Sequence, residues 1–252
     1  MEVAYYIEYL LPLLFFIVAF VYSSVGMGGG SSYTAIMVIA SMSSLAIPII
    51  SLSLNLFVTT IGSYNYLRNK HGKLRIILPF LLSAIPFAYV GGALQLPKEM
   101  FLWILLASLI LVAMRIYFWK DTGFRWQLNR QRKIVISLFL GSILGLIAGI
   151  VGIGGGVYLV PLIIMLNLGT QKEAAAAGTV FVWVVSLSGL VSRLQYNSIN
   201  LLEYTPLIIA VMIGGFLGSY MGSFKFSPKT MEKTLGIIII MAIVLLIKKI
   251  IV

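Results

Sequence analysis

The chain has no cysteine, a single histidine and few acidic residues. Its 252 residues contain 7 Asp and Glu against 18 Lys and Arg, and only 10% of the residues are charged. Without cysteine, the sequence excludes disulfides and carries no information on the redox compartment. It has no HExxH motif, no paired carboxylates and no serine with a histidine inside an apolar segment. An intramembrane hydrolase or metalloenzyme is therefore not expected, and we predict no enzyme activity, no metal site and no cofactor.

Acidic side chains are also missing from the interior of the apolar segments. Glu99, Glu173, Glu203 and Glu232 all fall at the ends of such segments. This distribution disfavours a proton pump, which needs buried carboxylates to relay protons. If transport is coupled to protons, the proton would travel on a weakly acidic substrate.

Apolar residues make up 60% of the chain, and the mean hydropathy is +1.05. A soluble domain of this size could not bury so much apolar surface, so we predict an all-α, multi-pass protein of the plasma membrane. The net charge of +11 lies in short loops, which sets orientation in a membrane and does not indicate a nucleic-acid partner. Eight apolar segments are expected, at residues 10–40, 45–67, 75–96, 99–119, 134–168, 172–197, 201–224 and 229–249.

A glycine cluster occurs twice, at residues 25–30 (VGMGGG) and 151–156 (VGIGGG), and its copies are 126 positions apart (26 and 152). Each copy interrupts the first long segment of one half of the chain. The pattern predicts two homologous four-segment halves, each with its first segment broken at the glycines, as in many secondary transporters. The predicted units are a first membrane repeat at 1–120, a basic cytoplasmic linker at 121–133 and a second membrane repeat at 134–252.

The path of the two broken segments stays open at this point. If each crosses the membrane, there are eight spans and 13 of the 18 Lys and Arg lie inside; if each turns back, there are six spans and 14 of the 18 lie inside. Charge therefore does not decide between them. Segment lengths of about 31 and 35 residues, at about 1.5 Å per residue, slightly favour a broken and tilted crossing.

A helix that restarts after a glycine break exposes free N–H groups and the positive end of its dipole, which together favour an anion. In the first half, Ser31 and Ser32 follow the break and can cap the helix or donate to a ligand. In the second half, Val157 and Tyr158 follow it, and neither offers a hydroxyl at the cap. The alternative is that glycine only permits close packing, which we expect at Gly141, Gly145 and Gly149 and at Gly214, Gly218 and Gly222.

The second and sixth segments carry polar residues at helical spacing. In the second, Ser51, Asn55, Thr59 and Ser63 form one stripe, which inside a membrane should face protein or a cavity. We expect Asn55 to contact substrate and the three hydroxyls to join helices. In the sixth, Thr179 corresponds to Ser53 of the second at the 126-residue offset, and Arg193 either reaches to the membrane surface or lines an anion path.

The sequence resembles the TauE/SafE family of sulfite exporters and toluene-sulfonate uptake permeases. The features that carry the resemblance are the paired GxGGG clusters at 26–30 and 152–156, the following Pro161, and the run AAAAGT at 174–179. The first half departs from this pattern, because it reads SLSLN at 51–55 where the second half has the Ala-Gly-Thr sequence. The resemblance implies ATP-independent transport of sulfite, organosulfonates or related small sulfur-containing anions.

We therefore predict a secondary transporter that binds a small anion near the middle of the lipid bilayer. An anion channel of similar architecture and a scaffold without transport activity are the alternatives, and association into homo-oligomers stays open. The predicted substrate-binding residues are Gly28, Gly29, Gly30, Ser31, Ser32, Asn55, Gly154, Gly155, Gly156, Thr179 and Arg193.

Overall fold

A computed structural model describes residues 2–118, 128–224 and 228–251, and these residues form ten α-helices and one short 3-10 helix, with no strand among them. The helices are α1 (Glu2–Ser24), α2 (Gly30–Ile39), α3 (Ala46–Arg68), α4 (Leu74–Ala93), α5 (Lys98–Phe118), α6 (Arg130–Val151), α7 (Gly156–Met165), α8 (Gln171–Leu194), η1 (Leu201–Tyr204), α9 (Thr205–Phe224) and α10 (Pro228–Ile251). The predicted all-α fold class is confirmed.

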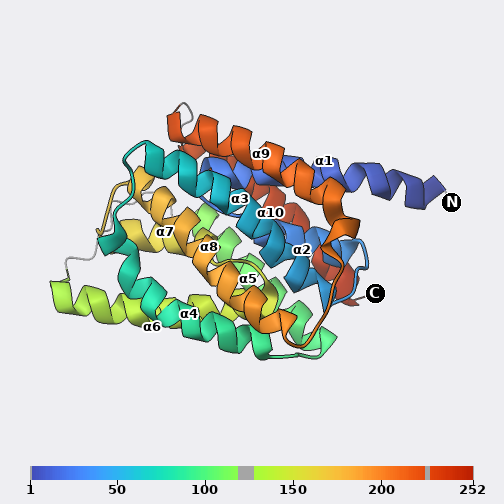
Figure 1. The fold of residues 1–252 in the computed structure, drawn as a ribbon, viewed down its shortest axis with the longest axis horizontal. Helices are drawn as coiled ribbons and strands as arrows, with labels where there is room; N and C mark the ends of the chain where they lie inside the picture. Colours follow the sequence, from blue (N-terminus) through green and yellow to red (C-terminus); the bar gives the residue numbers. More distant parts are fainter. Residues whose placement is uncertain (1, 119–127, 225–227, 252) are drawn as a thin grey trace.

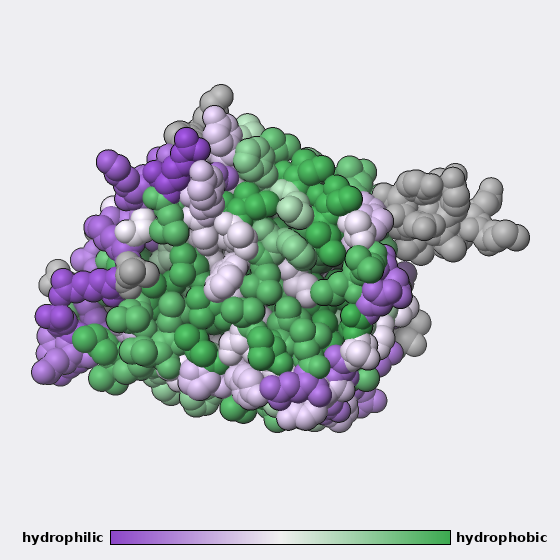
Figure 2. Space-filling model, viewed as in Figure 1, coloured by the Kyte–Doolittle hydropathy of each residue, from purple (hydrophilic) through white to green (hydrophobic). Residues whose placement is uncertain are grey.

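Five helical stretches among the described residues are long and apolar enough to cross a membrane: Ala46–Arg68, Arg75–Ala93, Arg130–Val151, Gln171–Leu194 and Leu201–Ser223. Figure 2 shows a broad apolar surface between hydrophilic residues at the two ends of the molecule. Such a band is what a bilayer of about 30 Å of hydrocarbon requires of a protein that spans it.

Helices α3 and α8 form the centre of the bundle. They are the most buried of the five, because 67% of the apolar stretch of each lies inside the protein. They cross where glycine allows close approach. A Cβ atom at Gly62 would lie 3.1 Å from Thr179 Cγ2, and one at Gly189 would lie 3.4 Å from Leu52 Cδ1. The remaining helices pack around this crossing (Figure 1).

The first broken segment turns back within the bundle. Helix α1 ends beside the end of α3, where the Tyr66 hydroxyl donates to Ser24 O at 2.8 Å. After the glycines, α2 starts midway along α3, because the Ser51 hydroxyl reaches Gly30 O at 3.3 Å. It then runs toward the beginning of α3, where Val38 and Ile47 line one pocket. The chain therefore enters and leaves this hairpin at the same end of the bundle.

The second broken segment makes the same hairpin from the opposite end. Helix α6 ends at the beginning of α3, since a Cβ at Gly152 would lie 2.9 Å from Pro48 Cα. Helix α7 then starts near the middle and runs back to the start of α6. There the Lys133 ammonium group donates to Asn167 O at 3.2 Å. Both ends of this segment lie at the end of the bundle that holds the α3–α4 connection (Figure 1, left).

These contacts decide the path of the broken segments. The slight preference for two full crossings, based on segment length, is wrong, because each broken segment returns to the end of the bundle from which it started. Length could not reveal this, since a full helix plus a short returning helix is as long as a tilted crossing. The end with Arg68, Lys70, Arg75 and Lys172 is called the basic end below, and the excess of cations predicts that it faces the cytoplasm.

The two predicted packing faces are confirmed. A Cβ atom at Gly145 or Gly149 would collide with the backbone of Ala84 or Ala88 on α4. The same holds for Gly218 of α9, which lies against the carbonyl of Phe20 on α1. The predicted linker at 121–133 falls largely outside the described residues, and α6 already begins at Arg130.

Candidate functional site

The two short helices begin in the same way, each after a glycine in the left-handed conformation. Gly29, the N-cap of α2, has φ 92°, and Gly155, the N-cap of α7, has φ 73°. Residues with a Cβ rarely adopt this conformation, so the local structure needs glycine at both positions. Neither helix has a side-chain hydrogen bond at its N-cap. The first N–H groups of both helices are therefore not capped by a side chain.

Asn55 of α3 lies between the two breaks and is fully buried. A Cβ at Gly28 would come within 2.5 Å of Asn55 Oδ1, and one at Gly154 within 2.9 Å of Asn55 Nδ2. The amide nitrogen donates to Gly152 O at 3.3 Å. Asn55 Oδ1 has no hydrogen-bond partner among the described residues. The predicted residues Gly28, Gly30, Gly154 and Asn55 are thus brought together.

Ser51, one helical turn before Asn55, joins the two breaks directly. Its hydroxyl donates to Gly152 O at 2.8 Å and lies 3.3 Å from Gly30 O, which also accepts from Thr34 Oγ1 at 2.7 Å. We predicted that Ser51 joins helices, and it does so here. We did not predict that it joins the two breaks. Its spacing of four from Asn55 is the signal that could have found it.

On α8, Val182 and Ser186 face the breaks, together with Phe181, whose Cε1 would lie 3.0 Å from a Cβ at Gly155. A Cβ at Gly156 would lie 2.5 Å from Val182 Cγ2, and one at Gly154 would lie 3.4 Å from Ser186 Oγ. The Ser186 hydroxyl is buried and has no partner in the described part of the chain. None of these three residues was among the predicted site residues.

Ser31 and Ser32 both bind the hydroxyl of Tyr22, at 2.8 and 2.7 Å. They therefore hold α2 against α1 and do not cap their own helix, whose N-cap is Gly29. All three side chains are buried. Tyr22 was not expected at the site, because its place beside the break depends on the turn of the hairpin.

Thr179 and Arg193 lie apart from the Asn55 group. The Thr179 hydroxyl bonds to Ala176 O within its own helix at 2.8 Å. The buried guanidinium of Arg193 donates to Gly149 O at 2.9 Å and to Ile150 O at 2.6 Å, so it caps the last carbonyls of α6. Neither residue reaches the breaks through a hydrogen bond in this structure.

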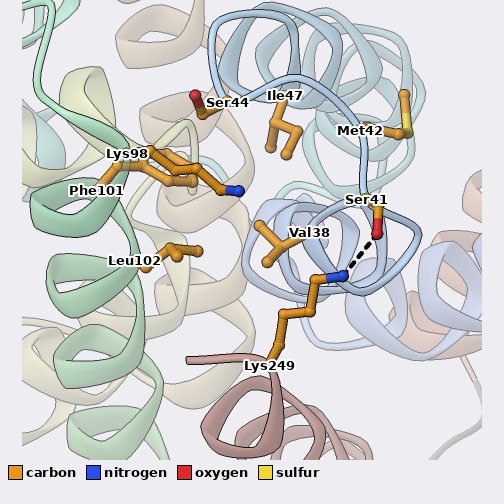
Figure 3. A pocket seen from close by; sticks show the side chains of 9 residues that line it. All are labelled: Val38, Ser41, Met42, Ser44, Ile47, Lys98, Phe101, Leu102 and Lys249. Carbon is orange, nitrogen blue, oxygen red and sulfur yellow. Dashed lines mark hydrogen bonds between the residues drawn. The ribbon is translucent and has the colours of Figure 1, made fainter. Parts of the chain in front are cut away.

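A small pocket of about 100 Å³ opens at the end opposite the basic end, where α2 ends and α3 and α5 begin. Two lysines and two serines line it (Figure 3). Lys98 reaches into the pocket, and the Lys249 ammonium group donates to Ser41 Oγ at 2.6 Å. Helices α3 and α5 begin and helices α2 and α10 end beside this pocket, so their dipoles offset one another, and its positive charge comes from the two lysines.

At the basic end, His71 and an ion pair lie in and beside the loop between α3 and α4. Lys73 pairs with Glu173, which also completes a capping box with Thr170 at the start of α8. Partial burial, together with the nearby Lys172, lowers the pKa of His71 below its usual value. This lower pKa favours the neutral form of His71.

Comparison with known proteins identifies the family. Residues 11–247 match the family described as sulfite exporter TauE/SafE. A probable membrane transporter protein of Sinorhizobium fredii is 31% identical over 211 residues, which cover 81% of this chain and 84% of that protein. Another, from Methanocaldococcus jannaschii, is 27% identical over 206 residues, covering 75% and 74% of the two chains. No solved structure matches the chain significantly. The chain therefore belongs to the TauE/SafE family and is a multi-pass transporter of the plasma membrane.

Proposed function

We propose that this protein is a secondary transporter of sulfite, an organosulfonate or a related small sulfur-containing anion, and that the anion binds between the two glycine breaks. One observation carries the proposal: the glycines that lead into α2 and into α7 approach the same buried side chain, Asn55, from opposite directions, at Gly28 and Gly30 in the first break and at Gly154 in the second. Two helix N-termini that meet inside a membrane place two positive dipole ends around one point. The family description, sulfite exporter, supports the choice of substrate class.

Backbone donors supply the main contacts with the anion. In α2, Gly29 O accepts from the N–H groups of Ser32 and Tyr33, and in α7, Gly155 O accepts from Tyr158 and Leu159. The N–H groups of the first two residues of each helix therefore stay available to a ligand. Glycine at 28–30 and 154–156 keeps Cβ atoms out of the space in front of these donors.

Two buried oxygens add selectivity. Asn55 Oδ1 and Ser186 Oγ have no partner among the described residues, and an unpaired buried polar group costs roughly 1–3 kcal/mol. A carbonyl oxygen only accepts, so the ligand at Asn55 must donate a hydrogen bond. A singly protonated oxyanion such as hydrogensulfite offers both an O–H donor and charged acceptor oxygens. None of the buried residues that the structure describes is a carboxylate. A protonated substrate would therefore carry its own proton through the membrane.

The other predicted residues support the site from a short distance. Ser31 and Ser32, through Tyr22, fix the start of α2, and Thr179 packs against Gly62 at the crossing of α3 and α8. The positive charge of Arg193 at the end of α6 attracts the anion from one side of the membrane. The electropositive pocket at Lys98 and Lys249 is the point where an anion gathers before it moves along α2.

Alternating access follows from the opposed hairpins. The glycines of both breaks lie close to Asn55 and Val182, and we take this arrangement as the closed state of the proposed site. Rocking of one half against the other separates one hairpin from this centre at a time. Because the hairpins enter from opposite ends, each movement opens the site to one side only.

Counterflow tests the proposal. Vesicles that contain the purified protein are loaded with unlabelled sulfite, and uptake of external radiolabelled sulfite is followed. A carrier gives uptake that internal sulfite accelerates, whereas a channel gives unitary currents without such acceleration. Thermal unfolding with sulfite, thiosulfate, taurine and sulfate identifies the preferred anion, since a bound ligand raises the unfolding temperature. The absence of both counterflow and any stabilisation by these anions would contradict the proposal.

A further inference from the structure

A second charged feature lies at the basic end, remote from the two glycine breaks. A cavity of about 640 Å³ is bounded by the first turns of α4 and α6 and by the chain that follows α7. Four cationic residues line it, namely Lys73, Arg75, Arg130 and Lys133. They come from two helices and a loop that are distant in sequence, so the fold brings them to one place.

The positive charge of this cavity is only partly compensated. Lys73 pairs with Glu173, and Lys133 donates to a backbone carbonyl. No acidic residue of the described chain lines the cavity. In addition, α4 and α6 both begin here without an acidic residue in the first turn. Cations at the positive end of a helix are unfavourable, and an anion between them relieves both the helix dipoles and the mutual repulsion.

Apart from Ser137 and Asn167, the remaining lining of the cavity is apolar, and apolar side chains continue along the outside of the bundle. Leu78 of α4 is 54% exposed and Ile134 of α6 is 40% exposed, and both line the cavity. On α4, Leu82 lies one turn beyond Leu78 and is 63% exposed; on α6, Val135, next to Ile134, and Phe139, one turn beyond Val135, are 64% and 66% exposed. Large apolar side chains so exposed on membrane-spanning helices face lipid. The cavity therefore joins a cationic head region to an apolar strip, which matches an amphiphile better than a free ion.

We propose that this cavity binds the phosphate of an anionic phospholipid from the cytoplasmic leaflet, with the acyl chains along α4 and α6. Arg75 and Arg130 are the principal phosphate contacts, because guanidinium groups bind phosphate oxygens in pairs and neither residue has a recorded acid partner in the described chain. Basic pockets between membrane helices on the cytoplasmic side commonly hold such headgroups. The site is distinct from the anion site between the breaks and does not depend on it.

Binding of defined lipids to the purified protein tests this assignment. The protein in neutral detergent is titrated with phosphatidylglycerol, with phosphatidylcholine and with inorganic phosphate, and bound lipid is counted by native mass spectrometry while thermal unfolding is recorded in parallel. We expect phosphatidylglycerol to bind and stabilise, phosphatidylcholine to bind at least tenfold more weakly, and inorganic phosphate to have no effect at the same concentration.

The double variant Arg75→Gln/Arg130→Gln should bind phosphatidylglycerol about 25-fold more weakly, since each cation near an anionic headgroup contributes about fivefold. The matched control Arg68→Gln/Lys70→Gln removes two cations of the same end that do not line the cavity, and it should bind as the wild type does. If the double variant does not fold, Arg130→Gln alone should show the fivefold loss. Equal binding of the two lipids, equal stabilisation by inorganic phosphate, or unchanged binding in the Arg75 and Arg130 variants would overturn the proposal.

Discussion

The two glycine hairpins share one shape but differ in chemistry. Gly26 lies against the backbone of Ala175, and Gly152, 126 positions later, lies against Pro48, which precedes Ala175 by 127. Yet the side chains that face the breaks are not alike. Asn55 of α3 lies nearest to Gly28 and Gly30, and Val182, 127 positions later, lies nearest to Gly154 and Gly156, while each also approaches one glycine of the other break. Homology of the halves stays a prediction; the contacts show that the two hairpins pack against corresponding positions of the chain.

The ends of the two long hairpin helices, α1 and α6, also have corresponding contacts made by different side chains. Tyr66 donates to Ser24 O at the end of α1, and Arg193, 127 positions later, donates to Ile150 O at the end of α6. A neutral phenol and a cation therefore perform the same capping task. The scaffold is preserved between the halves, while the amide lies in the first half and the buried charge in the second. Transport of an anion through this centre should depend on these unequal residues as much as on the shared glycines.

The largest effect is expected where the two hairpins are alike. Gly29→Leu and Gly155→Leu should each abolish sulfite transport, because a left-handed N-cap with φ 92° or 73° does not tolerate a branched side chain. Sulfite flux is measured in cells together with the amount of protein in the membrane. Gly215→Ala is a suitable control, because its added Cβ meets only Val58 on α3, at 3.2 Å or more. Normal flux in both leucine variants would exclude the breaks as the binding site.

The opposed direction of the hairpins can be tested by labelling, which the cysteine-free chain makes simple. Ser41→Cys and Asn167→Cys follow α2 and α7 at their exposed ends. We expect a membrane-impermeant maleimide to modify position 41 only from outside the cell and position 167 only from the cytoplasm. Two full crossings would instead place both positions outside, so labelling of position 167 in intact cells would contradict the hairpin path.

A smaller effect should separate the two helix-end caps. Arg193→Gln removes the charge but keeps an amide donor for the α6 carbonyls, so the KM for sulfite should rise on the order of threefold to tenfold through lost attraction. Tyr66→Phe removes one hydrogen bond of about 1 kcal/mol and should lower stability without changing KM. Both are measured by initial uptake rates and thermal unfolding. An unchanged KM in Arg193→Gln would show that the guanidinium group only caps α6 and does not attract the anion.

The smallest effect concerns the hydroxyl that joins the breaks. Ser51→Ala leaves Gly152 O with the longer hydrogen bond from Asn55 Nδ2, which should cost about 1 kcal/mol and lower the Tm by about 2–4 °C. Ser53→Ala is the matched control, because its buried hydroxyl bonds only to Ile49 O of the same helix. Its Tm should change by about 1 °C or less. Equal shifts in the two variants would show that Ser51 does not hold the hairpins together.

Much of the scaffold could be predicted from the sequence because it is encoded locally. Three consecutive glycines inside an apolar segment indicate a helix break, and glycines spaced by four indicate a packing face, and both features are present. The path of the chain after each break was not predictable, because the number of cations inside differs by only one between the two alternatives. It depends on contacts such as Tyr66 with Ser24, which join helices far apart in the sequence.

The candidate site was predicted only where its residues give a signal in the local sequence. Asn55 stood out because a buried amide in a membrane helix needs partners. Val182 and Ser186 gave no such signal, since only the antiparallel crossing of α3 and α8 brings them to the glycines. Tyr22 was missed because its serine partners were assigned to capping, whereas the hairpin turns their hydroxyls toward α1.

Equilibrium binding of radiolabelled sulfite to the purified protein, with Asn55→Asp beside the wild type, tests the central claim most directly. Aspartate keeps the shape of the asparagine but places a negative charge between the two helix starts, where it repels an anion. We predict saturable binding at one site per chain in the wild type, the same affinity in Ser53→Ala, and affinity at least about tenfold weaker in Asn55→Asp. Sulfite binding of unchanged affinity in a folded Asn55→Asp variant would contradict an anion site between the glycine breaks.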